Sequence, residues 1–140
     1  MNIKGFKVNF LGDSITEGVG TSAPAFRYVD RIKEMLSLAE ARNYGVSGSR
    51  IARQIGLTVF EGSERDFCMR AEEMSLDADA VVVFGGTNDY GHGALHLGKI
   101  NERIPETFCT ELRLLIEDLI QKYGEKKLCF LLPLRRYNDE

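Results

Sequence analysis

A serine close to the N-terminus occupies a position from which it could act as a nucleophile. Ser14 lies in the segment Gly12-Asp13-Ser14-Ile15, directly after residues 6–11, whose alternation of apolar and polar side chains predicts a β-strand. The carboxyl end of such a strand is where open α/β sheets bind ligands. A serine attacks a carbonyl carbon when a base takes its proton and donors bind the oxyanion. The alternative is a polar strand-to-helix turn with Asp13 and Ser14 as caps.

Two further polar loops follow predicted strands. Residues 45–50, which include Gly48, follow a short strand at 41–44, and residues 85–91, which include Asn88, follow the apolar run 80–84. Such a run is typical of a strand buried on both faces of a parallel sheet. Because parallel strands end at one edge, the N–H groups of Ser14 and Gly48 and the amide of Asn88 could bind one oxyanion. Each such donor could stabilise the transition state by roughly 3–4 kcal/mol. Asn88 could equally be a turn residue that bonds its own backbone.

These segments resemble the first three sequence blocks of the SGNH (GDSL-type) esterase family, over essentially the whole chain. The matching residues are Gly12-Asp13-Ser14-Ile15, Gly48 after Val46-Ser47, and Gly86-Thr87-Asn88-Asp89. The resemblance implies a flavodoxin-like three-layer α/β/α fold with a parallel sheet. It also implies hydrolysis of carboxylic esters through an acyl-enzyme at Ser14, with Gly48 and Asn88 in the oxyanion hole. Asp13 and Asp89 would brace their loops, and we expect neither a cofactor nor a metal.

Family members carry a fourth block, Asp-x-x-His, whose histidine is the general base. This chain ends shortly after a predicted strand at 128–132, before such a block could occur. We therefore expect a family domain that is incomplete at its C-terminus and inactive or nearly so, because a serine without its base is a poor nucleophile. Asp89 and His92 have the required spacing, but His92 would share a short loop with Asn88, whereas base and oxyanion donor should flank the serine from different directions. We expect His92 and His96 at a pocket rim or on the surface.

The elements that must position these residues follow from apolar periodicity. A helix is predicted from Pro24 to Leu36, short helices at 51–57 and 67–74, and the longest helix from Pro105 to a stop at Gly124. Strands that alternate with helices predict a parallel sheet with helices on both faces. A sheet without its last strand would expose the edge of residues 128–132, so we expect self-association through the incomplete sheet.

Composition limits the class of protein. A chain of 140 residues, 44% hydrophobic and 28% charged, is typical of one globular domain, here residues 1–140. The net charge of −3 argues against a nucleic-acid partner. No apolar run reaches the ~20 residues of a membrane span, and the first residues lack a signal peptide, so we expect a cytoplasmic protein. The cysteines, Cys68, Cys109 and Cys129, lie in apolar surroundings and predict buried, reduced thiols.

Three functions remain open on the sequence alone. The first is hydrolysis of a small-molecule ester, with acetylated carbohydrate favoured because the loops 21–26 and 91–104 are polar and aromatic. The second is a non-catalytic module of the same fold that binds an acyl group or another small molecule. The third is nucleotide binding, which rests on a loose glycine fingerprint at Gly18–Ala23 that comes too late after the first strand.

Overall fold

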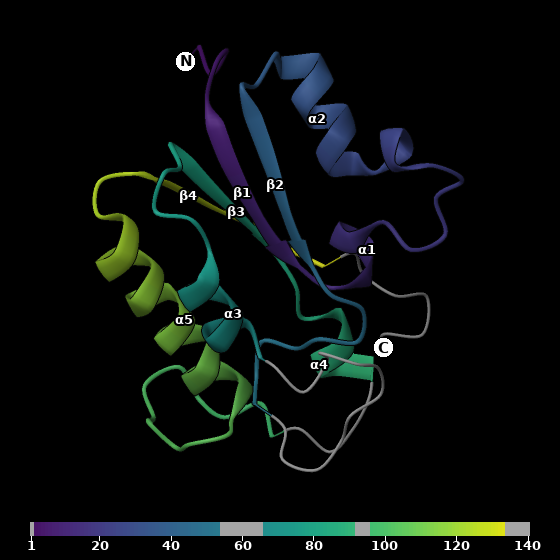
Figure 1. Cartoon of the computed structure of the whole chain (residues 1–140). Helices are drawn as coiled ribbons and strands as arrows, with labels where there is room; N and C mark the ends of the chain where they lie inside the picture. Colours follow the sequence, from purple (N-terminus) through teal and green to yellow (C-terminus); the bar gives the residue numbers. More distant parts are fainter. Residues whose placement is uncertain (1, 54–65, 92–95, 134–140) are drawn as a thin grey trace.

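The computed structural model describes residues 2–53, 66–91 and 96–133. Four parallel strands form one sheet in the order β2-β1-β3-β4 (Figure 1). These strands are β1 (Lys7–Gly12), β2 (Glu40–Gly45), β3 (Ala80–Phe84) and β4 (Lys127–Leu131). The order, with β1 and β3 in the centre, is that of the first four strands of a flavodoxin-like sheet. The predicted α/β fold with a parallel sheet is confirmed.

Helices cover both faces of this sheet and make three layers. Helix α2 (Tyr28–Leu36) packs on one face, and α3 (Phe67–Glu73) and α5 (Phe108–Tyr123) pack side by side on the other (Figure 1). Two short helices, α1 (Ser14–Glu17) and α4 (Thr87–Gly91), begin just beyond the ends of β1 and β3. A 3-10 turn, η1 (Pro24–Phe26), precedes α2.

The two cores follow the alternation of side chains along the central strands. Val8 and Phe10 of β1 face α2 and pack with its Val29, whereas Leu11 points to the opposite face. There Leu11 joins Val81 and Val83 of β3 and the buried stripe of α5, formed by Leu115, Leu119 and Tyr123. On the α2 side, Ala80 and Val82 of β3 are only half-buried, so the predicted burial of this apolar run on both faces is confirmed in part.

Several predicted boundaries are wrong for identifiable reasons. The helix predicted from Pro24 is broken at Arg27, whose extended backbone (φ −62°, ψ 142°) separates η1 from α2. Residues 51–53 are not helical, and the rest of the helix predicted at 51–57 lies outside the described residues. The long helix begins at Phe108, later than Pro105. Cys68 and Cys109 are half-buried and Cys129 is exposed, so the prediction that all three cysteines are buried is wrong.

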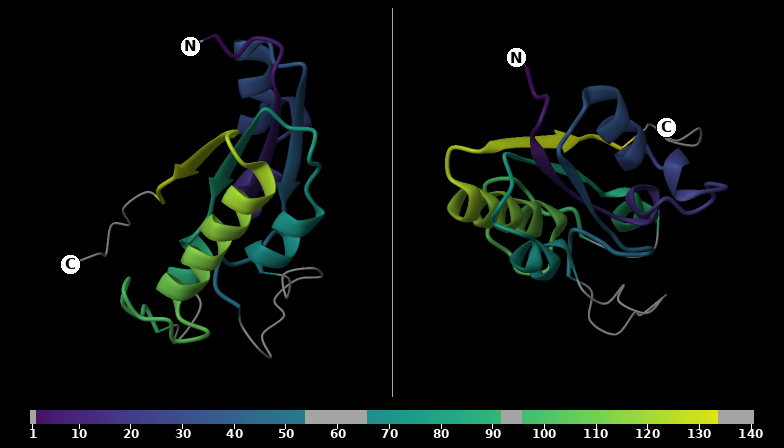
Figure 2. Two further views of the ribbon diagram at one scale, coloured as in Figure 1. Left: turned by 90° about the vertical axis from the view of Figure 1, so that its left-hand side faces the viewer. Right: turned by 45° about the horizontal axis from the view of Figure 1, so that its top comes forward.

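Strand β4 is an edge strand with two unlike faces. Leu128 and Phe130 pack against the core beneath α3 and α5, whereas Cys129 and Leu131 point to the other face and are exposed. Figure 2 shows β4 at the margin of the sheet, with α5 on one side of it. Among the described residues, no strand pairs with the outer edge of β4. The described part of the chain also holds no helix long and apolar enough to cross a membrane.

Candidate active site

Ser14 is the first residue of α1, two residues after the end of β1. Asp13 is the N-cap, and its Oδ1 accepts a hydrogen bond of 2.9 Å from the Ile15 N–H. The N–H of Ser14 has no intrahelical partner because it lies in the first turn. Among the described residues, neither this N–H nor the hydroxyl of Ser14 forms a hydrogen bond. Ser14 is half-buried, so its hydroxyl and N–H are available to a ligand at this edge.

Glycines allow α1 to lie directly on the ends of β1 and β2. A Cβ added at Gly12 would collide with the Thr16 side chain, and one added at Gly45 would collide with the backbone of Glu17. Thr16 is buried, and its hydroxyl pairs with the Tyr28 hydroxyl at 2.9 Å. The close approach of α1 to Gly12 and Gly45 fixes the distance of Ser14 from the end of the sheet.

The loop that carries Gly48 is bonded directly to the Ser14 segment. Val46 N–H donates to the Gly12 carbonyl at 3.1 Å, and the Glu17 carboxylate accepts the Ser47 N–H at 2.7 Å as well as the Ser47 hydroxyl. Gly48 has a left-handed φ of 73°, which a residue with a side chain adopts only with strain. Within the described ranges its N–H donates to no other group. The loop therefore presents a free donor next to α1.

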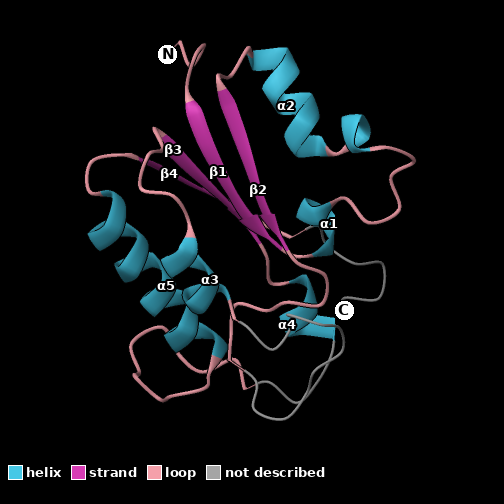
Figure 3. Ribbon diagram, viewed as in Figure 1, coloured by secondary structure: helices cyan, strands magenta, loops and turns pink. Residues whose placement is uncertain are grey.

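Asn88 and Asp89 attach α4 to the same loop. Asn88 is buried, and its Nδ2 donates to the Ser49 carbonyl at 2.9 Å, which leaves the second N–H of this amide for another acceptor. The carboxylate of Asp89 accepts the Ile51 N–H at 3.1 Å and the Ala52 N–H at 2.8 Å. The carboxyl ends of β1, β2 and β3 are thus joined into one site, and Figure 3 shows α1 and α4 on this side of the sheet.

The two aspartates of the site are buried carboxyl groups beside buried arginines. Burial raises the pKa of Asp13, while its hydrogen bond from Ile15 and the nearby Arg70 act in the opposite direction. Burial likewise raises the pKa of Asp89, against its backbone hydrogen bonds and the nearby Arg50. In both cases desolvation of the charged form is the largest effect.

Sequence reasoning missed one buried residue that contacts the ends of β1 and β2 and the loop that carries Gly48. The Arg70 guanidinium of α3 donates to the Gly12 carbonyl at 2.7 Å, the Tyr44 carbonyl at 2.9 Å and the Ser49 hydroxyl at 2.6 Å. A signal was available, since Arg70 shares the apolar face of its helix with Phe67, Ala71 and Met74, which are all buried. Glu17, which holds Ser47, was missed as well.

Of the two histidines, the structure describes only His96. His96 is exposed, and its carbonyl accepts the Phe108 N–H at 3.0 Å. His92 lies outside the described residues. The described part of the chain also contains no cluster of histidine, cysteine and acidic side chains that could hold a metal ion. The glycine fingerprint does not open a helix, because Gly18 is the left-handed C-cap of α1 and ends it.

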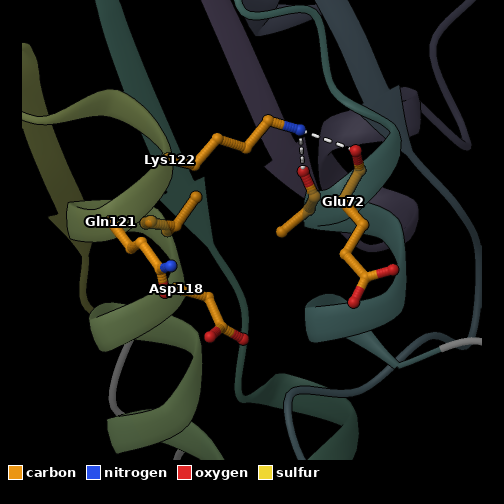
Figure 4. A pocket seen from close by; sticks show the side chains of 6 residues that line it. Glu72, Asp118, Gln121 and Lys122 are labelled. Atoms are coloured by element: carbon orange, nitrogen blue, oxygen red, sulfur yellow. Dashed lines mark hydrogen bonds between the residues drawn. The ribbon is translucent and has the colours of Figure 1, made fainter.

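A shallow pocket lies away from this edge, between α3 and α5. Four of the six residues that line it are polar or charged, and the six are Ala71, Glu72, Asp118, Leu119, Gln121 and Lys122. The Lys122 ammonium crosses from α5 and donates to the carbonyls of Ala71 at 2.8 Å and Glu72 at 2.6 Å (Figure 4). These carbonyls lie in the last turn of α3, and that of Ala71 also accepts the N–H of the C-cap Met74 at 3.3 Å. The feature therefore caps a helix and joins two helices.

Fold and site together define an α/β protein with a serine, a glycine and an asparagine at the carboxyl edge of a flavodoxin-like sheet. The sequence model of the GDSL-like lipase/acylhydrolase family matches residues 10–139. The chain belongs to this family. No curated protein sequence matches the chain significantly.

Solved structures share this fold. A protein from Lactobacillus plantarum is 27% identical with a TM-score of 0.74, over 91% of this chain and 56% of its own. A candidate GDSL-like lipase from Bacteroides ovatus is 20% identical with a TM-score of 0.71, over 91% and 72%. Axe2, an acetylxylan esterase from Geobacillus stearothermophilus, is 21% identical with a TM-score of 0.55, over 91% and 61%. The chain thus spans little more than half the length of the Lactobacillus plantarum structure.

Proposed function

We propose that this chain carries the nucleophile and the oxyanion hole of a serine-dependent carboxylic-ester hydrolase. The observation that carries the proposal is the direct bonding of three loops at one sheet edge. Val46 reaches the Gly12 carbonyl, and Asn88 reaches the Ser49 carbonyl. Together with membership of the acylhydrolase family, this arrangement supports Ser14, Gly48 and Asn88 as one catalytic unit.

Each residue has a distinct chemical role in this proposal. The Ser14 hydroxyl attacks the ester carbonyl carbon, the alcohol leaves with a proton, and water then hydrolyses the acyl-enzyme. The N–H groups of Ser14 and Gly48 and the second N–H of Asn88 stabilise the oxyanion. Asp13 and Asp89 hold their loops, because their carboxylates accept the backbone N–H groups of Ile15, Ile51 and Ala52.

No described residue is hydrogen-bonded to Ser14 as a general base would be, and we propose that the 140-residue chain alone turns over esters very slowly. Both oxygens of Asp89 already accept backbone N–H groups, which supports a bracing role over orientation of His92. The exposed His96 has no hydrogen bond to Ser14. Loss of one triad member removes several orders of magnitude in rate.

Acetylated carbohydrate is the substrate class that we propose. Two exposed side chains adjoin the candidate catalytic residues: Ile15, which follows Ser14 and is 44% exposed, and Tyr90, which is two residues after Asn88 and 65% exposed. An exposed aromatic ring offers an apolar face to a sugar. The shared fold with the acetylxylan esterase Axe2 is consistent with this class.

Chemical rescue tests the proposal on this chain. Imidazole would supply a general base, so hydrolysis of p-nitrophenyl acetate should rise with imidazole in the wild type more than in Ser14→Ala. The Ser14→Ala protein at the same imidazole concentration corrects for the reaction of imidazole with the ester in solution. Asn88→Ala should lower the Ser14-dependent rate by about 10²–10³, as loss of an oxyanion donor does. Equal rates for wild type and Ser14→Ala would refute the esterase proposal and favour a module that binds acyl groups without turnover.

We also propose that the chain self-associates through β4. The support is that no described strand pairs with the outer edge of β4, together with exposed apolar side chains at its end, since Leu131 is 38% and Leu132 84% exposed. Such edges pair readily with a second copy. Sedimentation analysis should show a dimer or larger species that Leu131→Lys converts to monomer. A wild-type monomer at high concentration would contradict the proposal.

A further inference from the structure

The buried guanidinium of Arg70 meets the ends of two strands and the glycine loop at once. Its Nη2 donates to the Gly12 carbonyl of β1 at 2.7 Å and to the Tyr44 carbonyl of β2 at 2.9 Å, and its Nη1 donates to the Ser49 hydroxyl at 2.6 Å. Arg70 is only 5% exposed. The planar fork of arginine can serve acceptors in several fixed directions, which the single ammonium of lysine cannot match.

Ser49 extends this contact to the third donor of the site. Its hydroxyl donates to the Val46 carbonyl at 2.6 Å while it accepts from Arg70, and its own carbonyl accepts the Asn88 amide at 2.9 Å. Ser49 directly follows Gly48. A continuous chain of hydrogen bonds therefore runs from the Gly12 carbonyl through Arg70 and Ser49 to Asn88.

Helix α3 holds the guanidinium firmly in this place. Asp66 caps the helix, with its Oδ1 accepting the Met69 N–H at 2.9 Å, and the Phe67 ring lies 4.9 Å below the Arg70 guanidinium carbon. The buried carboxyl of Asp13 lies close enough for its charge to interact with Arg70. A buried cation needs such partners, because leaving it unpaired costs several kcal/mol.

We propose that Arg70 is a positioning residue that sets the spacing of the three oxyanion donors. It acts on Ser14 through the Gly12 carbonyl, and on Gly48 and Asn88 through Ser49. The proposal rests on the proposed esterase function for its consequence in catalysis. Its structural part, the locking of the Gly48 loop onto β1 by the guanidinium, stands independently of that function.

Three variants test the proposal against the wild type. Arg70→Met removes the donors but keeps an unbranched apolar chain, and Arg70→Lys keeps the charge without the fork. Lys122→Met is the matched control, because Lys122 also stabilises α3 through the carbonyls of Ala71 and Glu72 but does not touch the strand ends (Figure 4). Any effect of a merely loosened α3 should therefore appear in all three proteins.

Amide hydrogen exchange measures how firmly the loop that carries Gly48 is held, and it does not require enzymatic activity. The reporters are the N–H groups of Val46 and Ser49, which donate to the carbonyls of Gly12 and Val46. We expect Arg70→Met to speed their exchange at least about ten-fold relative to strand amides such as Val83, and Lys122→Met to leave this ratio unchanged. An unchanged ratio in Arg70→Met, or an equal rise in Lys122→Met, would overturn the proposal. If Arg70→Met does not fold, the same ratio in Arg70→Lys decides.

Kinetics with imidazole then measure the consequence for catalysis. Misplaced donors should lower the Ser14-dependent kcat of Arg70→Met by about 10–100-fold with little change in KM, and Arg70→Lys should recover part of it. A normal kcat in a protein with a loosened loop would contradict the catalytic part. If the wild type shows no Ser14-dependent turnover, the esterase function fails, and the exchange ratio alone still decides whether Arg70 locks the loop.

Discussion

Replacement of Asp89 by alanine tests whether a buried carboxylate holds the site together. The carboxylate accepts the N–H groups of Ile51 at 3.1 Å and Ala52 at 2.8 Å, and both residues are less than 5% exposed. Each buried N–H left without an acceptor costs about 1–3 kcal/mol. Relief from burying the carboxylate, whose pKa burial raises, offsets part of this loss. We therefore expect Asp89→Ala to lower the free energy of unfolding by about 2–4 kcal/mol.

Urea unfolding followed by circular dichroism at neutral pH measures this difference. Asp118→Ala is the matched control, because Asp118 lies exposed on α5 (Figure 4). Such a surface change should stay within about 0.5 kcal/mol of the wild type. A cost below about 1 kcal/mol for Asp89→Ala would refute the reasoning, since it would mean that the two N–H groups find other acceptors.

The pH dependence of the same variant has a definite sign. Because the folded chain raises the pKa of Asp89, it binds this proton more tightly than the unfolded chain does. The contribution of Asp89 to stability is then fully present below the ordinary pKa of aspartate and falls as pH rises through the folded pKa. The stability difference between wild type and Asp89→Ala should shrink with rising pH across this window. A difference that grows with pH would contradict the direction of the shift.

Two further predictions concern a thiol and a close packing contact. Burial raises the pKa of Cys68 to about 12, so iodoacetamide at pH 8 should modify the exposed Cys129 first and Cys68 last. Peptide mass spectrometry measures the two rates of modification, and equal rates would contradict the prediction. Gly45→Ala should lower the melting temperature more than Gly5→Ala. A Cβ at Gly45 meets the backbone of Glu17, whereas a Cβ at Gly5 meets open space and costs only the strain of its left-handed φ of 81°. Equal shifts in calorimetry would argue against the Gly45 contact.

The strands and the longest helix could be predicted because their sequences carry strong periodic signals. The apolar run of β3 and the stripe of α5 match the observed elements closely. The short helices α1 and α4 could not be predicted, because Asp13-Ser14 and Thr87-Asn88 also suit turns. Contacts made by the fold decide there: Asp13 caps α1, and Asn88 and Asp89 of α4 bind the loop after β2.

The position of the site at one sheet edge also follows from sequence, whereas its internal support does not. Parallel strands end together, so Ser14, Gly48 and Asn88 are expected at one edge. A single arginine within a charged helical segment is most often solvated, and only the folded chain reveals that Arg70 turns inward to three acceptors. The role of Glu17 likewise depends on the approach of α1 to Gly45.

Trapping of the acyl-enzyme tests the central claim most directly. The chain would be incubated with p-nitrophenyl acetate and imidazole, quenched in acid, digested and mapped by mass spectrometry. The account predicts one acetyl group on the peptide that contains Ser14, absent from Ser14→Ala and reduced in Asn88→Ala. Acetylation confined to lysines or to Cys129, and equal in wild type and Ser14→Ala, would contradict the assignment of Ser14 as the nucleophile.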